Sequence, residues 1–276
     1  MTTLSVATES PRARPARRPF LPLVNADLLK LRRNRGLVAV AAAMTIGGMV
    51  IAYGILAILH AANPAHHGPA GGVENLGHGI GLLALLGSAA GILAGARAGA
   101  GDLSSGVFRE LVITGRSRLA LFAARVPGGL AFLLPLVAVA VVIAAAATVG
   151  FAGTLPSPSA GLLAEAGLWV TIDVAFYFAL ALGLASLIGS RAQTVGILLA
   201  WRLAVAPLLV SIGALGPGRD ALPQAAFERL APEALNEYIR QGPVVSMSAA
   251  TAVLTIVLWT GVALGLGAWR TVTRDA

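Results

Sequence analysis

Residues 36–59 read GLVAVAAAMTIGGMVIAYGILAIL, an apolar run that contains no charged side chain. At a rise of about 1.5 Å per residue, about 20 such residues cross the hydrocarbon core of a bilayer as an α-helix. Because lipid offers no partner to unpaired backbone groups, a run of this length is expected to be helical. The sequence therefore predicts a transmembrane helix at this position.

Five further runs of the same kind divide the rest of the chain. Hydrophobic residues make up 57% of the 276 residues and charged residues only 12%, about half the charged share of a soluble domain. The gaps are too short for a separate soluble domain. We therefore predict an all-α, polytopic membrane protein with six transmembrane helices. The five further runs are residues 79–96, 126–150, 167–188, 193–215 and 246–269.

Positive charge is concentrated in alternate gaps between the runs. Of the 20 Lys and Arg residues, sixteen lie before the first run, in the second and fourth gaps, and in the tail. Since Lys and Arg are retained in cytoplasmic loops, this asymmetry predicts that both termini are cytoplasmic. The net charge of +8 is thereby explained by membrane topology, so we expect the lipid bilayer, and not nucleic acid, as the partner. Three residues lie on the opposite side, namely Arg219, Arg229 and Arg240.

The segment before the first run has two parts. Residues 1–20 are rich in Arg, Pro and Ala and are predicted to form a disordered basic cytoplasmic tail, which leaves residues 21–276 as one membrane domain. Apolar residues then recur at helical spacing, which predicts a short basic helix in the headgroup layer. A frayed segment whose Arg residues only set topology is the alternative. The helical pattern consists of Leu21, Val24, Leu28 and Leu31, with Asp27, Lys30, Arg32 and Arg33 between them.

Two further gaps lie on the predicted outer side. Residues 151–165 are rich in Pro, Ser and Gly and are predicted to form a turn. Residues 216–242 are predicted to form one or two short helices, broken at Pro232, that rest on the outer membrane surface.

Residues 101–118, in the second gap, read GDLSSGVFRELVITGRSR. Ser104 or Ser105 can cap a short helix with one apolar face, and Gly115 can end it. Such a helix can dock into a groove of another protein or fold back on its own bundle, and the spacing favours neither. The candidate residues of this segment are Ser105, Gly106, Phe108, Arg109, Glu110, Leu111, Gly115, Ser117 and Arg118.

The same segment resembles a stretch in the permeases of ABC-2 type transporters, the transmembrane subunits of bacterial ABC exporters. That family has Gly-Thr-x-Arg-x-Leu-Leu-x-x-Pro-x-Ser-Arg after its second span, and this chain departs from the pattern at Val107, Val112 and Gly115. The helix predicted before the first run is similar to the amphipathic elbow of these permeases. Residues 201–223 are similar to their fifth span and outer Leu-Pro segment. The matching positions of the loop are Gly106, Arg109, Leu111, Ser117 and Arg118.

The resemblance implies a permease subunit of an exporter in the bacterial plasma membrane. Such a subunit has no catalytic residues and no cofactor, because ATP and Mg²⁺ bind to a separate nucleotide-binding ATPase subunit. That subunit docks on the coupling helix, here within residues 104–118. Two permeases, as a homodimer or heterodimer, and two ATPases form the working unit. Independently, the chain contains no Gly-x-x-x-x-Gly-Lys-Ser/Thr loop for phosphates, and its residues do not identify the cargo.

Two other functions remain open from the residues alone. A secondary transporter or channel is expected to show an internal repeat of spans one to three in spans four to six, and no clear repeat is present. A membrane-bound assembly or sensor subunit without transport is the third possibility.

Asp173 and Arg202 are the two charged residues inside the predicted spans. A charge at mid-membrane costs about 2.5–3.5 kcal/mol on insertion scales. We expect the two to form an ion pair that joins spans four and five. A water-filled substrate path lined by Arg202, or separate snorkelling of each side chain, is the alternative.

Small residues mark one face of the second span, where Gly87, Gly91, Gly95 and Gly99 recur at every fourth position. This spacing lets two helix backbones approach closely. Ordinary packing within the chain is the first interpretation, and a sliding or dimer-facing surface is the alternative.

No catalytic or metal site is predicted. Cysteine is absent, and no histidine lies well inside a span to activate a serine. Four histidines cluster around the first outer gap, but their spacing fits no zinc-binding template. These are His60, His66, His67 and His78.

Overall fold

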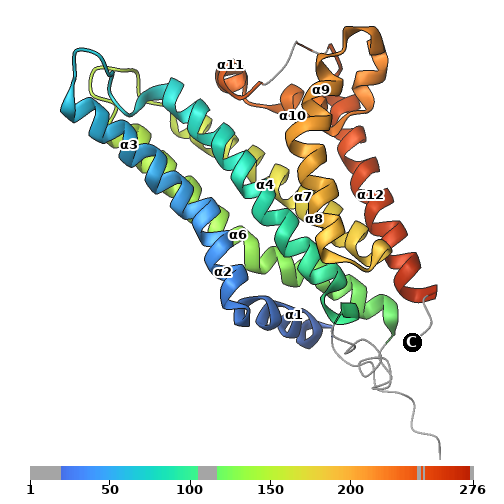
Figure 1. Cartoon of the computed structure of the whole chain (residues 1–276). Coiled ribbons are helices and arrows are strands. Elements are labelled where there is room, and N and C mark those ends of the chain that lie inside the picture. Colours follow the sequence, from blue (N-terminus) through green and yellow to red (C-terminus); the bar gives the residue numbers. More distant parts are fainter. Residues whose placement is uncertain (1–19, 105–116, 241–243, 245, 274–276) are drawn as a thin grey trace, which may run out of the picture.

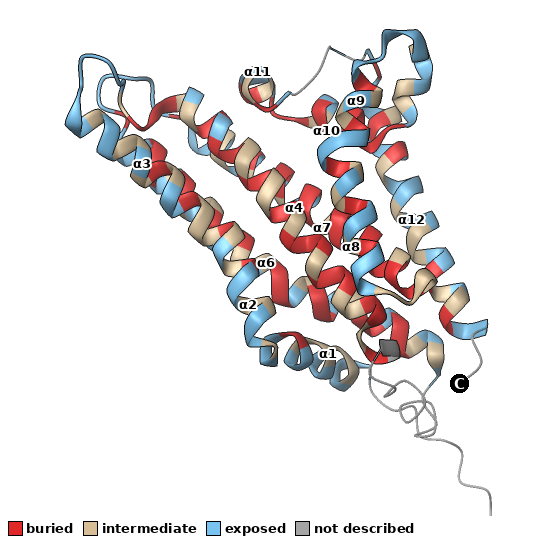
Figure 2. Cartoon of the chain, in the orientation of Figure 1, coloured by how far each residue is buried: buried red, intermediate tan, exposed pale blue. Residues whose placement is uncertain are grey.

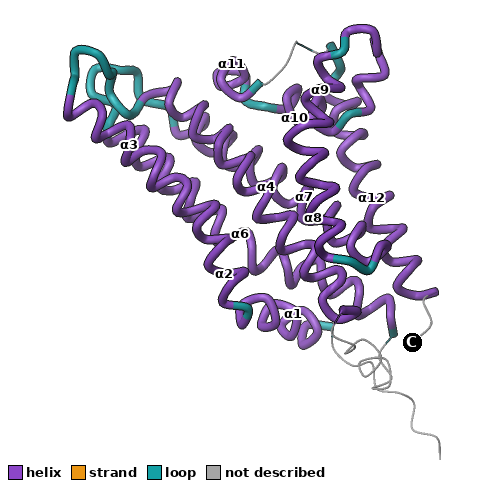
Figure 3. The backbone as a smooth tube through the Cα atoms, viewed as in Figure 1, coloured by secondary structure: helices purple, strands orange, loops and turns teal. Residues whose placement is uncertain are grey.

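The computed structural model describes residues 20–104, 117–240, 244 and 246–273. Every regular element among these residues is helical (Figure 3). Six helical segments within them are long and apolar enough to span a membrane, as expected of a multi-pass helical membrane protein. These spans are Arg35–Ala62, Gly72–Asp102, Arg118–Gly150, Ala160–Ile188, Arg191–Ser211 and Ala249–Thr273.

Four of the spans are continuous α-helices, and the first and fifth are interrupted by a π-helical turn. The continuous helices are α4 (Gly72–Ser104), α6 (Arg118–Gly150), α7 (Ala160–Ile188) and α12 (Ala249–Thr273). The first span consists of α2 (Arg35–Ala42), η1 (Ala43–Gly47) and α3 (Gly48–Ala62). The fifth consists of α8 (Arg191–Ala200), η2 (Trp201–Val205) and α9 (Ala206–Ser211).

Several helices extend beyond the apolar runs that predicted them. Helix α6 begins at Arg118, where the Ser117 hydroxyl accepts a hydrogen bond of 3.1 Å from the Ala120 N–H. Helix α7 begins at Ala160 after a similar cap from Ser159, so the turn predicted over residues 151–165 is shorter. Hydropathy marks only the part of a helix that lies in lipid, whereas a serine cap marks where its hydrogen bonds begin.

Helices α4 and α7 form the centre of the bundle. Figure 2 shows their buried residues in the interior, whereas most of the apolar surface of α12 is exposed. Exposed apolar side chains are normal for a helix that faces hydrocarbon, because lipid tails are as apolar as leucine. The two central helices therefore pack against other helices of the chain, whereas α12 exposes the apolar surface expected of a helix that faces lipid.

The glycine face of the second span packs against α7 of the same chain. A Cβ added at Gly95 would lie 2.3 Å from the Phe178 carbonyl oxygen, and one at Gly99 would lie 2.5 Å from the Leu182 carbonyl oxygen. A Cβ at Gly91 would lie 2.9 Å from the Val174 carbonyl oxygen, and one at Gly87 would lie 2.8 Å from a side-chain methyl group of Val174. The structure thus assigns all four glycines to close packing within the chain, which lets the two backbones touch.

Replacing Gly95 by alanine is expected to destabilise the chain by about 1–3 kcal/mol, because the added methyl group overpacks the contact with α7. The matched control is Gly261→Ala in α12, where an added Cβ would meet nothing within 4 Å. The control should gain up to about 1 kcal/mol from helix propensity. Unfolding of the detergent-solubilised variants by titration with dodecyl sulfate measures both, and equal stability of the two variants contradicts the packing.

Short helices cover the two ends of the bundle (Figure 1). Helix α1 (Leu21–Arg33) lies across the end at which α12 finishes. The opposite end has four short helices, and the predicted break at Pro232 is confirmed. Residues 223–228 of α10 are buried, chiefly against α12, so this helix packs into the end of the bundle. The prediction that the segment rests on the membrane surface stays a prediction. The four helices are η3 (Gly213–Ala221), α10 (Pro223–Leu230), η4 (Glu233–Leu235) and α11 (Asn236–Ile239).

Candidate functional site

Six polar side chains from four elements meet inside the bundle, and we call them the buried polar cluster. None of the six residues is more than 8% exposed. In a span, groups of this kind face the bundle interior and mark functional or structural sites. The cluster consists of Ser88 from α4, Asp173 and Tyr177 from α7, Arg202 from η2, and Gln224 and Glu228 from α10.

The guanidinium group of Arg202 is the centre of this cluster. Its Nε donates to the Ser88 hydroxyl at 3.4 Å, and its Nη1 donates to the Gln224 side-chain oxygen. Its Nη2 lies 3.8 Å from the Asp173 carboxylate. Its central carbon lies 5.0 Å from the centroid of the Tyr177 ring, within the range of a cation–π contact. The buried cation is therefore compensated from several directions.

Asp173 has fewer partners than Arg202. Neither of its carboxylate oxygens has a hydrogen-bond partner among the described residues, and the same holds for the Tyr177 hydroxyl. Arg202 is the one cation with which the described part of the chain pairs this carboxylate. The structure thus brings together the two intramembrane charges that the sequence singled out. It adds Ser88, Gln224 and Glu228, which sequence reasoning did not connect with them.

The position of Arg202 depends on an irregular turn. Pro207 lies in the first turn of α9, where it cannot donate to the carbonyl of residue 203 and its ring crowds that carbonyl. The π-helical turn η2 directly precedes this point and contains Arg202. Single π turns of this kind often occur at functional sites. Pro207 is the sequence signal for this irregularity, which the apolar run over residues 193–215 does not reveal by itself.

Helix α10 is held against the spans by the cluster and by contacts of the neighbouring Phe227. Gln224 donates from Nε2 to the Glu228 carboxylate at 2.9 Å. Trp169 of α7 donates from Nε1 to the Phe227 carbonyl oxygen at 3.0 Å. The Phe227 ring also meets Phe176 edge-on, with centroids 5.2 Å apart. The i, i+4 spacing of Gln224 and Glu228 places both on one helix face, which was the available sequence signal.

A second group of charges lies at the end of the bundle that carries α1, and we call it the charged joint. Asp102 of α4 accepts bonds from Lys30 Nζ at 2.8 and 3.0 Å and from Arg125 Nη2 of α6 at 3.0 Å. Arg125 also donates to the Gly99 carbonyl oxygen at 3.2 Å. Close backbone packing accompanies these bonds, since a Cβ at Gly128 would lie 2.9 Å from the Val24 carbonyl oxygen. One carboxylate thus links α1, α4 and α6.

The bonds of the charged joint differ in strength. The Arg125 side chain is only 2% exposed, whereas that of Lys30 is 42% exposed. The Arg125–Asp102 pair is therefore the stronger one, because exposed pairs contribute little.

Burial raises the pKa of Asp27, an effect that the neighbouring Lys30 partly opposes. From the sequence, Lys30 belongs to the predicted basic helix before the first span and Arg125 to the positive charge of the second gap. Neither pattern indicates that Asp102 joins them.

Chemically, the buried polar cluster can hold charge but has no activated nucleophile. The Ser88 hydroxyl donates to the Leu85 carbonyl oxygen at 2.9 Å, and the cluster contains no histidine that would take its proton. No protein-family model and no curated protein matches the chain. Its function is therefore inferred from its own residues and their arrangement.

Most of the predicted ATPase-coupling segment lies outside the described residues. This applies to Ser105, Gly106, Phe108, Arg109, Glu110, Leu111 and Gly115. Of the remaining two residues, Ser117 caps α6, and Arg118 donates from Nη1 to the Val272 carbonyl oxygen near the end of α12 at 3.2 Å. The segment is flanked by α4 and α6, and both helices belong to the charged joint.

The histidines around the first gap between the spans do not converge. His60 Nδ1 lies 2.7 Å from the His67 carbonyl oxygen, whereas the His78 ring meets Tyr238 edge-on. Within the described ranges, no group of three His, Cys, Asp or Glu side chains is placed to hold a metal ion.

Proposed function

We propose that this chain is the membrane-spanning permease subunit of a bacterial ATP-driven exporter of the ABC-2 type. The observation that carries the proposal is the charged joint. It ties α1 to the two helices that flank residues 105–116 through the bonds of Asp102 to Lys30 and Arg125. A movement of that segment would therefore be transmitted to three helices, α1, α4 and α6. Six helices of spanning length and the resemblance of residues 106–118 to the family motif support the same function.

The proposed topology places the α1 end of the bundle in the cytoplasm. Both termini then lie on the side where ATP is available, and residues 1–20 form a basic tail ahead of the permease domain, residues 21–276. Helix α1 presents exposed Leu21 and Leu29 beside exposed Arg32 and Arg33. This mixture suits an elbow helix in the headgroup layer, where apolar groups reach the acyl boundary and cations meet anionic lipid.

The proposed mechanism needs two copies of the permease, identical or different, and two ATPase subunits that bind ATP and Mg²⁺. Closure of the ATPases would draw the coupling segments together. The charged joint would transmit this movement to α4, and the glycine contacts would pass it to α7. At the far end, the buried polar cluster would hold α10 against the spans until the outward-facing state forms. Rocking of bundles about a central site is a common form of alternating access.

Co-expression with the nucleotide-binding ATPase subunit that the proposal requires, whose gene we expect beside this reading frame, tests the proposal. The two proteins should purify together in detergent, and the chain should change the rate of ATP hydrolysis by the ATPase in proteoliposomes. Absence of both a stable complex and an effect on hydrolysis overturns the proposal. Transport driven by an ion gradient in proteoliposomes that contain the chain alone favours a secondary transporter instead.

A further inference from the structure

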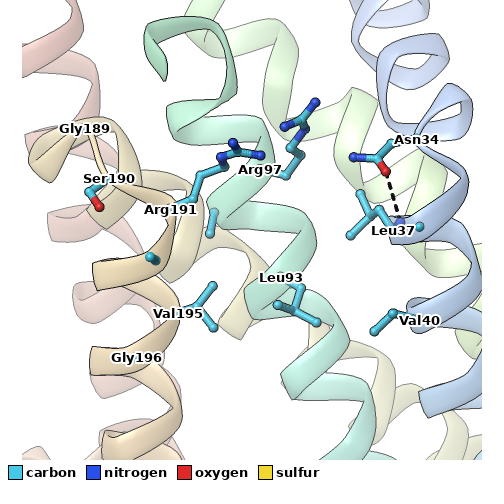
Figure 4. A pocket seen from close by; sticks show the side chains of 13 residues that line it. Asn34, Leu37, Val40, Leu93, Arg97, Gly189, Ser190, Arg191, Val195 and Gly196 are labelled. Atoms are coloured by element: carbon cyan, nitrogen blue, oxygen red, sulfur yellow. Dashed lines mark hydrogen bonds between the residues drawn. The ribbon is translucent and has the colours of Figure 1, made fainter. Parts of the chain in front are cut away.

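A pocket of about 910 Å³ opens between α2, α4 and α8 at the α1 end of the bundle (Figure 4). Its volume lies within the range of small-molecule sites. Leu37, Val40, Leu93 and Val195 form apolar walls. The pocket is therefore large and apolar enough for part of an amphiphile.

Two arginines from different helices lie at one end of this pocket. Figure 4 shows the guanidinium groups of Arg97, from α4, and Arg191, from α8, on the same side of the apolar walls. Neither side chain forms an ion pair or hydrogen bond with another described residue. None of the described residues that line the pocket is acidic. Among the described residues, nothing compensates these two positive charges beside the apolar cavity.

We propose that this pocket binds an anionic phospholipid. Its phosphate would lie between Arg97 and Arg191, because guanidinium groups bind phosphate oxygens through paired, charge-assisted hydrogen bonds. One acyl chain would lie along the walls formed by Leu37, Leu93 and Val195. Basic pockets between transmembrane helices on the cytoplasmic side are suited to anionic headgroups.

The depth of the residues fits this orientation of the lipid. Gly36 and Arg191 lie at the start of their spans and Arg97 near the end of its span, whereas Val40 and Val195 lie one turn further in. The charged part of the pocket is therefore at headgroup level, and the apolar part faces the hydrocarbon. This inference goes beyond the proposed exporter function and does not require an ATPase partner.

Lipid binding by the purified, delipidated full chain in detergent tests the inference. Native mass spectrometry should show tighter binding of dioleoyl phosphatidylglycerol than of dioleoyl phosphatidylcholine. Arg97→Gln and Arg191→Gln should each weaken phosphatidylglycerol binding about fivefold, and the double variant about 25-fold. Arg270→Gln removes one positive charge at the same end of the bundle but outside the pocket, so it should leave the affinity unchanged.

Two further arms separate the lipid from other occupants. Arg97→Lys combined with Arg191→Lys keeps both charges but loses the paired hydrogen bonds, so its affinity should lie between those of the natural chain and the neutral double variant. This intermediate affinity guards against a folding defect of the neutral double variant. Inorganic phosphate at millimolar concentration should not displace the lipid. Equal binding of the two lipids, full affinity in a folded neutral double variant, or displacement by phosphate overturns the inference. Loss of lipid binding on dimerisation of the chain also overturns it, because a second copy would then occupy the pocket.

Discussion

Replacing Arg202 by methionine is expected to lower the free energy of unfolding by about 3–5 kcal/mol, because it leaves a buried charge without its partner. The Asp173 carboxylate has no hydrogen bond to a described residue and lies 3.8 Å from the Arg202 guanidinium group. The same change removes the donors to Ser88 and Gln224. Titration of the detergent-solubilised variant with dodecyl sulfate measures the loss.

A second substitution shows whether the two charges interact. Asp173→Asn in the Arg202→Met background removes the remaining charge of the pair and should recover part of the lost stability. Arg240→Gln is the matched control, since Arg240 is exposed directly after α11, and it should change stability by less than about 0.5 kcal/mol. The Asp173→Asn single variant completes the comparison. If the double variant loses as much stability as the two single variants together, Asp173 and Arg202 act independently.

Reversing the charge of Arg109 is expected to weaken binding of the ATPase subunit by about tenfold or more, because it would place a carboxylate against the groups that bind the guanidinium group in the proposed complex. Arg109 occupies the position of the family arginine in the segment that resembles the coupling helix. Arg109→Glu should also abolish the effect of the chain on ATP hydrolysis in proteoliposomes. The ATPase rate with and without the variant provides the measurement.

The control for this prediction is Arg219→Glu, which makes the same change of charge at the opposite end of the bundle. It should leave the complex and the ATPase rate unchanged. If Arg109→Glu behaves like this control, residues 105–116 are not the contact that couples the two subunits.

The spans could be predicted from the sequence because the bilayer imposes one dominant requirement. A chain in lipid must satisfy its backbone hydrogen bonds internally, so each apolar run becomes a helix. The pairing of Asp173 and Arg202 was predictable for a related reason. Charges inside spans are costly and rare, and each therefore has few possible partners. The two residues are the charges within the six apolar runs.

The helix rotations and long-range partners could not be predicted in this way. Hydropathy does not distinguish the faces of a helix that is apolar all round, and α4 and α7 are of this kind. The bond between Asp102 and Arg125 depends on how α4 and α6 are rotated against each other. The insertion of Gln224 beside Arg202 depends on α10 packing into the bundle. Packing geometry, which acts between residues far apart in sequence, determines these contacts.

The proposed exporter function is tested most directly by the side of the membrane on which the coupling segment lies. The natural chain has no cysteine, so a single introduced thiol reports its position without background. Ser117 and Ser157 are both exposed and lie in consecutive gaps between spans. A membrane-impermeant maleimide added to spheroplasts should label Ser157→Cys and should reach Ser117→Cys only in inverted vesicles. Labelling of Ser117→Cys in intact spheroplasts would place the coupling segment away from ATP and contradict the proposed function.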